Sequence, residues 1–189
     1  MNQNKIVFLR DKKLLSTMEE NFSLASVEKW DYFEVFEWKR GFWEEFENLV
    51  CCYYENFSKA YEYVSENYDI YKIIIIDQAN ILSSIDLKPG DIVIPNTFLN
   101  AINNDAVFIE YAIGENYDLN KFGLSLNGIC VSGYNEEEID VCADVRNNDI
   151  FQVVKDVSLD ENIDKTVVIL SIEWNEGSNN ILNVMELVL

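Results

Sequence analysis

The chain contains no histidine, which limits the acid–base chemistry open to it. Without histidine there is no Ser-His-Asp or Cys-His catalytic set, no histidine-ligated zinc and no side chain whose ordinary pKa lies near neutrality. Carboxylates must therefore carry any proton transfer. The four cysteines are Cys51, Cys52, Cys130 and Cys142, and their spacing suits neither a zinc site nor an ordinary disulfide. We expect buried thiols in a reducing compartment, no metal and no cofactor.

The charge balance excludes one large class of partner. Lysine and arginine number 14 against 34 aspartates and glutamates, which gives a net charge of −20. Such a surface repels phosphate backbones, and no basic stripe interrupts it, so we expect no binding to nucleic acid. The first apolar run, Ile6–Leu9, is too short for a signal peptide or a membrane span. The sequence therefore predicts a cytoplasmic protein that does not enter a membrane.

The elements that would position any site alternate between strands and helices. The clearest is Tyr71–Ile76, where four consecutive isoleucines indicate a strand buried on both faces. A chain of 189 residues with this pattern predicts a single α/β domain over residues 1–189. The other expected strands are residues 6–9, 23–36, 91–94, 106–111, 128–132 and 166–172, and the expected helices are residues 11–21, 42–68 and 149–157.

Aromatic residues are concentrated between Trp30 and Tyr71, which hold 15 of the 25 in the chain. This is more than one amphipathic helix can bury. Exposed tryptophan and tyrosine are typical anchors of protein interfaces, so we expect some of region 30–71 to form a surface for self-association or for a protein partner. The alternative is that all of these rings pack onto the sheet.

Two segments resemble a known family. Residues 73–95 read IIIIDQANILSSIDLKPGDIVIP, an apolar strand followed by the block Leu87–Pro95, and Gly128–Gly133 read GICVSG. The sequence is similar in these segments, and in the order of Val141, a helix and the strand 167–171, to the nucleoside phosphorylase superfamily. That superfamily includes purine nucleoside phosphorylases and methylthioadenosine/S-adenosylhomocysteine nucleosidases. The resemblance implies a three-layer αβα sandwich with a central mixed sheet, and cleavage of a purine N-glycosidic bond by water or phosphate.

The resemblance also implies where each catalytic group should stand. An Ile-Ser-Asp motif on a late strand supplies the acid that protonates the departing purine. This chain reads Leu170-Ser171-Ile172-Glu173, so Ser171 matches and Glu173 is the nearest acid. Glu173 is one methylene longer than aspartate and one residue further along, so it needs a shifted backbone to reach the purine.

The ribose hydroxyls are normally bound by the glutamate of a Met-Glu pair, and the matching residues here are Val145 and Arg146. Arginine only donates hydrogen bonds and is permanently charged. It would place a cation beside a developing oxocarbenium ion, which opposes catalysis. Arg146 can instead bind an anion or pair with a neighbouring acid.

Three further positions depart from the family pattern. Lys13 is the residue nearest to the position at which nucleosidases have the glutamate that activates water. The family's glycine-rich loop, which lets the backbone approach the ligand, corresponds to residues 77–81, and of its pattern only Ala79 is kept. The Ser-Gly-Asp strand end becomes Ser132-Gly133-Tyr134. The segments that match are those of the scaffold, whereas the positions that carry chemistry have mostly changed.

The sequence therefore favours a nucleosidase-like protein with impaired catalysis, retained for binding a purine nucleoside or for assembly, as a homo-oligomer or with a protein partner. A first alternative is an active purine nucleosidase with Glu173 as the acid and Asp144 or Asp149 binding the ribose. A second is an acidic protein-interaction module, which the net charge of −20 supports.

Overall fold

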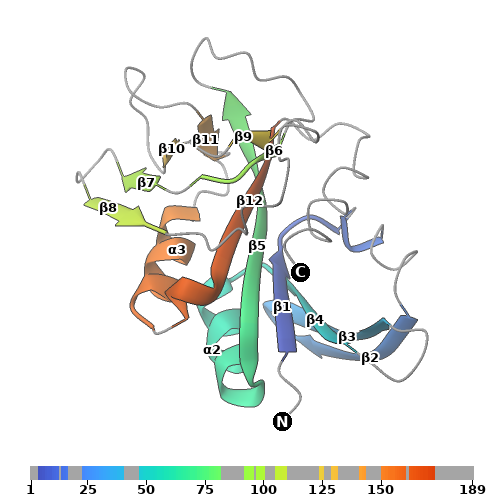
Figure 1. Ribbon diagram of the computed structural model, residues 1–189. Coiled ribbons are helices and arrows are strands. Elements are labelled where there is room, and N and C mark those ends of the chain that lie inside the picture. Colours follow the sequence, from blue (N-terminus) through green and yellow to red (C-terminus); the bar gives the residue numbers. More distant parts are fainter. Residues whose placement is uncertain are drawn as a thin grey trace. The chain divides into compact units, whose positions relative to one another are not determined.

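The computed structural model describes residues 4–12, 14–16, 23–40, 47–81, 92–95, 97–100, 105–109, 124–125, 129–131, 141–143, 150–160 and 162–172. They divide into two compact units, one within residues 1–76 and the other within residues 77–188. The strand β5 (Ile70–Ile81) begins in the first unit and ends in the second (Figure 1).

The first unit is a mixed sheet in the strand order β2-β3-β4-β1-β5. β1 (Asn4–Leu9) lies between β4 (Glu47–Tyr54) and β5 and is parallel to both, with Ile6 opposite Val50 on one side and Ile73 on the other. β2 (Ser23–Trp30) and β3 (Phe33–Arg40) form an antiparallel hairpin that pairs with β4. The predicted strands at residues 6–9 and 71–76 are confirmed, and Ile73–Ile76 are buried as expected.

One face of this sheet is covered by the helix α2 (Phe57–Asn67). The ring of Phe8 from β1 lies 4.9 Å from that of Phe57 and 6.2 Å from that of Tyr61, centroid to centroid. Phe57 also packs edge-on against Tyr54 of β4, at 5.3 Å. These rings form the aromatic core of the unit.

The long helix predicted over residues 42–68 is wrong for residues 47–54, which form β4, and right for α2. Leu49 to Cys52 and Tyr54 are all buried, because β4 is covered on both faces. Such a strand shows no polar alternation, and apolar residues four apart at positions 49, 53 and 57 then imitate a helix. The single strand expected over residues 23–36 is two strands joined by a turn at Asp31-Tyr32.

The aromatic residues of region 30–71 divide into buried, half-buried and exposed rings. The buried rings are Phe33, Phe36, Trp38, Tyr54, Phe57 and Tyr61. Trp30, Tyr32 and Tyr71 remain 52%, 46% and 52% exposed. Half of the described rings of this region are therefore buried, and the remaining three, Tyr53, Tyr63 and Tyr68, are half-buried.

Cys51 and Cys52 are buried thiols in the middle of β4, as expected. Burial raises the pKa of the Cys52 thiol to about 12, so it stays protonated and unreactive at neutral pH. The side chains of Cys130 and Cys142 lie outside the described residues.

The amino end of α2 carries a testable cap. The side chain of Asn56 accepts a hydrogen bond from the backbone N–H of Lys59, at 3.1 Å. We expect Asn56→Ala to lower the free energy of unfolding by about 1 kcal/mol, since the amide of Lys59 loses its partner. Urea denaturation measures this, with Glu62→Ala on the exposed side of the same helix as the control. An equal loss in both variants would mean that the cap contributes nothing of its own.

The strands of the second unit form two sets that both join β5, because β11 and β12 each pair with it. In the first, the end of β5 pairs antiparallel with β11 (Val141–Ala143), and β11 is parallel to β10 (Ile129–Val131). β10 is parallel to β7 (Thr97–Asn100), which pairs antiparallel with β8 (Asp105–Phe108). In the second set, β6 (Ile92–Val93) lies between β12 (Thr166–Ile172) and β9 (Leu124–Ser125).

The helix α3 (Ile150–Ser158) and a short 3-10 turn (Ile163–Lys165) precede β12. α3 buries Ile150, Phe151, Val153, Val154 and Val157, which confirms the helix predicted at 149–157. The strands predicted at 91–94, 106–111, 128–132 and 166–172 are confirmed as β6, β8, β10 and β12. β7 and β9 were not predicted, because short mixed segments such as Thr97–Asn100 carry too few residues to show a period.

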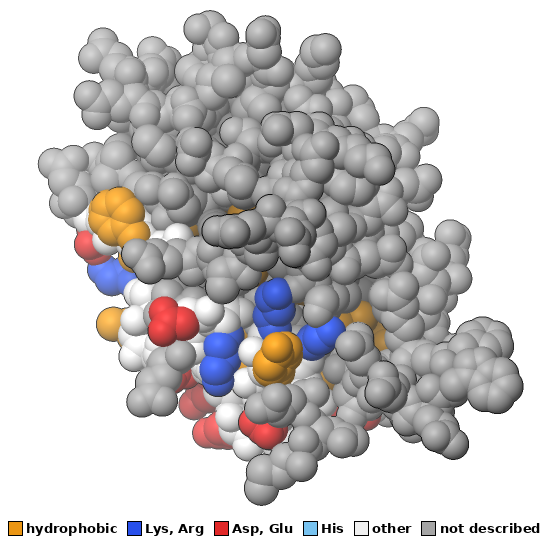
Figure 2. Space-filling model, in the orientation of Figure 1, with side chains coloured by type: hydrophobic (Ala, Val, Ile, Leu, Met, Phe, Trp, Pro, Cys, Tyr) orange, Lys and Arg blue, Asp and Glu red, His pale blue; other side chains and the backbone are white. Residues whose placement is uncertain are grey.

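On the face shown in Figure 2, acidic and basic side chains of the described residues lie interspersed, with hydrophobic side chains between them. Among the described residues, no helix combines the length and the apolar character needed to cross a membrane.

Candidate functional site

Two residues of the block Leu87–Pro95 support β12, the strand that precedes the candidate acid in the sequence. These residues, Ile92 and Val93, form β6, which pairs antiparallel with Ser171 and Leu170 of β12. Ile92 and Leu170 are fully buried, and Ser171 is buried although it is polar. The most specific match in the sequence is therefore a structural support for the end of β12, two residues before Glu173.

This pairing carries a prediction. We expect Ile92→Ala to lower the free energy of unfolding by at least about 2 kcal/mol, because it opens a cavity beside β12. If β12 positions a ligand-binding group, the same variant should also bind purine nucleosides more weakly. Thermal denaturation with and without methylthioadenosine measures both effects. A variant that loses stability and keeps full affinity would show that β6 supports the core and not the site.

The position of the expected glycine-rich loop is occupied by a strand. Residues 77–81 continue β5, and Ala79 and Asn80 pair antiparallel with Ala143 and Cys142 of β11. Ala79 is buried. At the start of this segment, the backbone N–H of Gln78 donates to the carboxylate of Asp77 at 2.8 Å. The backbone here is an extended ladder strand, not an open loop that could surround a ligand.

The segments that contain the other predicted site residues follow two neighbouring strands. β10 and β11 are parallel, with Cys130 opposite Val141 and Val131 opposite Cys142. Both strands therefore end at the same edge of the sheet. In the sequence, Ser132 follows β10 directly and Val145 comes two residues after β11.

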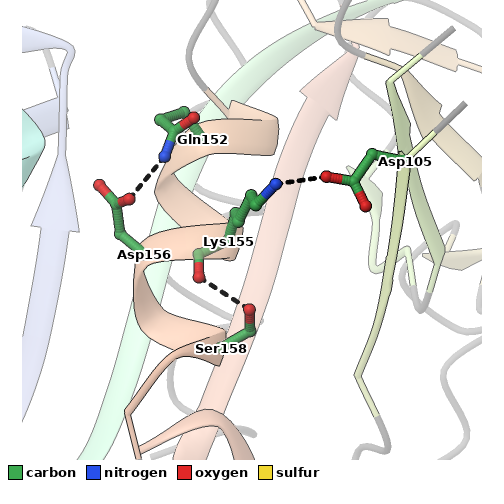
Figure 3. A network of polar contacts seen from close by, with 5 residues as sticks. All are labelled: Asp105, Gln152, Lys155, Asp156 and Ser158. Atoms are coloured by element: carbon green, nitrogen blue, oxygen red, sulfur yellow. Dashed lines mark hydrogen bonds and ion pairs between the residues drawn. The ribbon is translucent and has the colours of Figure 1, made fainter. Parts of the chain in front are cut away.

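α3 is held against β8 by a polar network, shown in Figure 3. Lys155 forms an ion pair with Asp105 of β8, and its ammonium group lies 5.8 Å from the centre of the Phe151 ring. On the same helix, Gln152 donates to Asp156 at 2.6 Å, and the hydroxyl of Ser158 donates to the carbonyl of Lys155 at 2.7 Å. The partners Asp105 and Lys155 are 50 residues apart, so no local sequence pattern could have indicated the pair.

Of the predicted site residues, only Ala79 and Ser171 lie in the described part of the chain. Both are buried, at the ladder positions given above. The others lie outside the described residues, and their roles remain predictions: Lys13, Ser132, Tyr134, Asp144, Val145, Arg146, Asp149 and Glu173. In the part of the chain that the structure describes, no group of acidic or cysteine side chains could hold a metal ion.

No family model matches the sequence, and no curated protein is similar enough in sequence to match it. Solved structures, in contrast, match along the whole chain. A futalosine hydrolase mutant of Helicobacter pylori superimposes with a TM-score of 0.63 at 13% identity, covering 100% of this chain and 98% of the hydrolase.

Two further solved structures match with similar scores. The 5'-methylthioadenosine/S-adenosylhomocysteine nucleosidase of Neisseria meningitidis, in complex with methylthio-immucillin-A, gives a TM-score of 0.62 at 11% identity, covering 100% of this chain and 92% of the nucleosidase. The purine nucleoside phosphorylase of Toxoplasma gondii, in complex with immucillin-H, gives 0.60 at 12% identity, covering 100% and 90%. The chain therefore has the α/β fold of the nucleoside phosphorylase and nucleosidase superfamily, as the sequence predicted.

Proposed function

We propose that this chain is a nucleosidase-like protein that binds a purine nucleoside and has lost most of the capacity to cleave it. The fold supports a nucleoside ligand, because structures of the same fold hold nucleoside analogues. The observation that most supports impaired catalysis is the strand pairing between β5 and β11. Residues 79–81 form a strand where the resemblance implies a glycine-rich loop against the ligand.

The changed residues outside the described part point in the same direction. Arg146 stands where a carboxylate would bind the ribose and stabilise positive charge, and Lys13 stands nearest to the position of the water-activating glutamate. Each substitution replaces an acceptor by a cation. Electrostatic complementarity to an oxocarbenium-like transition state is lost at both positions. Ser132, Tyr134, Val145 and Ser171 complete the proposed ligand site.

The proposal has a second part. The protein is retained for binding or for assembly, with itself or with another protein, through the aromatic residues of region 30–71. We take residues 1–189 as one domain and place the protein in the cytoplasm, in line with the buried thiols of Cys51 and Cys52.

The binding part is tested by thermal denaturation with adenine, methylthioadenosine, S-adenosylhomocysteine, inosine or phosphate. A ligand at about 100 times its dissociation constant adds about 2.7 kcal/mol to the free energy of unfolding, which raises the melting temperature by several degrees. We expect a rise with at least one nucleoside and none with phosphate. No rise with any compound would contradict nucleoside binding.

The active alternative, with Glu173 as the acid, is favoured by the support that β6 gives to the end of β12. It would make the chain an N-glycosidic bond hydrolase. The two versions differ in one observable, which is whether bound nucleoside is converted to free base. The second alternative, an acidic interaction module, predicts a salt-dependent complex with a basic protein and no nucleoside affinity.

A further inference from the structure

We propose that the tip of the β2–β3 hairpin is a docking site for a basic segment of another protein, with Trp30 as the anchor. The site consists of Trp30, Tyr32, Phe33 and Tyr63 with the carboxylates Glu28 and Asp31, and is called the hairpin-tip platform below. Glu34 does not belong to it, because its carboxylate pairs with Lys29 at 3.1 Å. This inference deepens the assembly part of the proposed function. Its test uses no nucleoside, so a negative result would overturn the docking site without bearing on nucleoside binding.

The side chains of the platform pack against one another. The Trp30 ring stacks on the buried Phe33 ring at 5.9 Å and packs against Tyr63 of α2 at 5.2 Å. Tyr63 also lies 5.3 Å from Phe33, and its hydroxyl donates to the carboxylate of Glu28. Half of Trp30 nevertheless remains exposed. An exposed tryptophan held in one orientation loses little conformational entropy on binding, which is typical of an interface anchor.

Hydrogen bonds also connect the backbone of the turn to the start of α2. The carbonyl oxygen of Tyr32 accepts hydrogen bonds from the backbone N–H groups of Glu55 and Asn56, at 2.8 and 3.3 Å. These two residues immediately precede α2. The hairpin tip and the start of α2 therefore form one surface.

The chemistry of the platform favours a cationic occupant. Lys59 already places its ammonium group 3.8 Å from the centre of the Tyr32 ring, which shows that the tip accommodates a cation over an aromatic face. Trp30 offers the aromatic side chain that binds cations best, and along the chain it lies between the exposed residues Glu28 and Asp31. A guanidinium or ammonium group could lie on Trp30 and pair with either carboxylate. The net charge of −20 would also draw a basic partner towards the surface.

A second copy of the chain fits less well. Two chains of charge −20 repel each other. β2 stands at the end of the strand order, but its pairing register with β3 shifts between Leu24 and Ser26, and its exposed residues include Glu28 and Lys29. Irregular pairing and charged side chains on an edge strand discourage the addition of another strand.

The test uses the full chain and a fluorescent peptide in which arginines alternate with glycines, with the citrulline version of the peptide as the neutral control. Fluorescence anisotropy gives the dissociation constants at low and high salt. We expect Trp30→Ala to weaken arginine-peptide binding by about fivefold to tenfold, and Trp30→Phe to keep most of it. Tyr71→Ala is the matched control, because Tyr71 is as exposed as Trp30 and lies on β5.

Two outcomes would overturn the proposal. Equal binding by wild type, Trp30→Ala and Tyr71→Ala would show that the peptide follows the overall charge and not the platform. Concentration-dependent self-association that Trp30→Ala abolishes would assign the platform to a second copy. Should Trp30→Ala fail to fold by circular dichroism, Tyr32→Ala removes a ring of the same platform and is judged by the same criteria.

Discussion

Replacing Arg146 by glutamate should raise the rate of purine release by about 10- to 100-fold. A positive charge about 6–8 Å from a developing oxocarbenium ion costs about 2–3 kcal/mol at an effective dielectric constant near 20. Glutamate removes that cost and restores an acceptor for the ribose hydroxyls. Lys13 remains unchanged, so the variant should not reach the rate of a complete nucleosidase.

Arg146→Met and Arg146→Lys separate the two contributions. Methionine removes the charge without supplying a strong acceptor and should give an intermediate rate, whereas lysine keeps the charge and should leave the rate as it is. Adenine release from methylthioadenosine, followed by chromatography, measures all four proteins. The same rate in the glutamate variant and the wild type would show that Arg146 does not face the ribose.

The second large effect concerns stability. Phe8→Ala should lower the free energy of unfolding by about 3–5 kcal/mol, since Phe8 is fully buried and its ring contacts those of Tyr54, Phe57 and Tyr61. The cavity would lie between β1 and α2, at the centre of the first unit. Urea denaturation measures the loss, and Tyr71→Ala at an exposed position of the same unit should cost less than about 0.5 kcal/mol. Similar losses in the two variants would contradict the assignment of the aromatic core.

The sequence predicted the fold where pattern and resemblance agreed. The isoleucine run 73–76 predicted a buried strand from hydropathy alone. The block Leu87–Pro95 predicted the position of β6. β4 was missed because burial on both faces removes the alternation by which strands are recognised. Its pairing with β1 and β3 is decided by contacts between segments tens of residues apart. No local pattern contains that information.

The candidate site divides in the same way. The resemblance assigned roles to Ala79 and Ser171, and the structure shows what the sequence could not: each is a ladder position, one opposite β11 and the other opposite β6. That residues 77–81 form a strand follows from the pairing partner at residues 141–143. The aromatic count predicted a surface in region 30–71, but only the exposed fraction of each ring in the structure distinguishes Trp30 from the buried rings.

The central claim, nucleoside binding without efficient cleavage, is tested most directly by one single-turnover experiment. Excess wild-type protein is mixed with labelled methylthioadenosine, bound ligand is separated from free ligand, and the bound fraction is analysed for adenine. We predict that intact methylthioadenosine is recovered from the protein, and that Glu173→Gln gives the same result. Recovery of adenine from the wild type, and of intact nucleoside from Glu173→Gln, would contradict the account and establish an active nucleosidase with Glu173 as its acid.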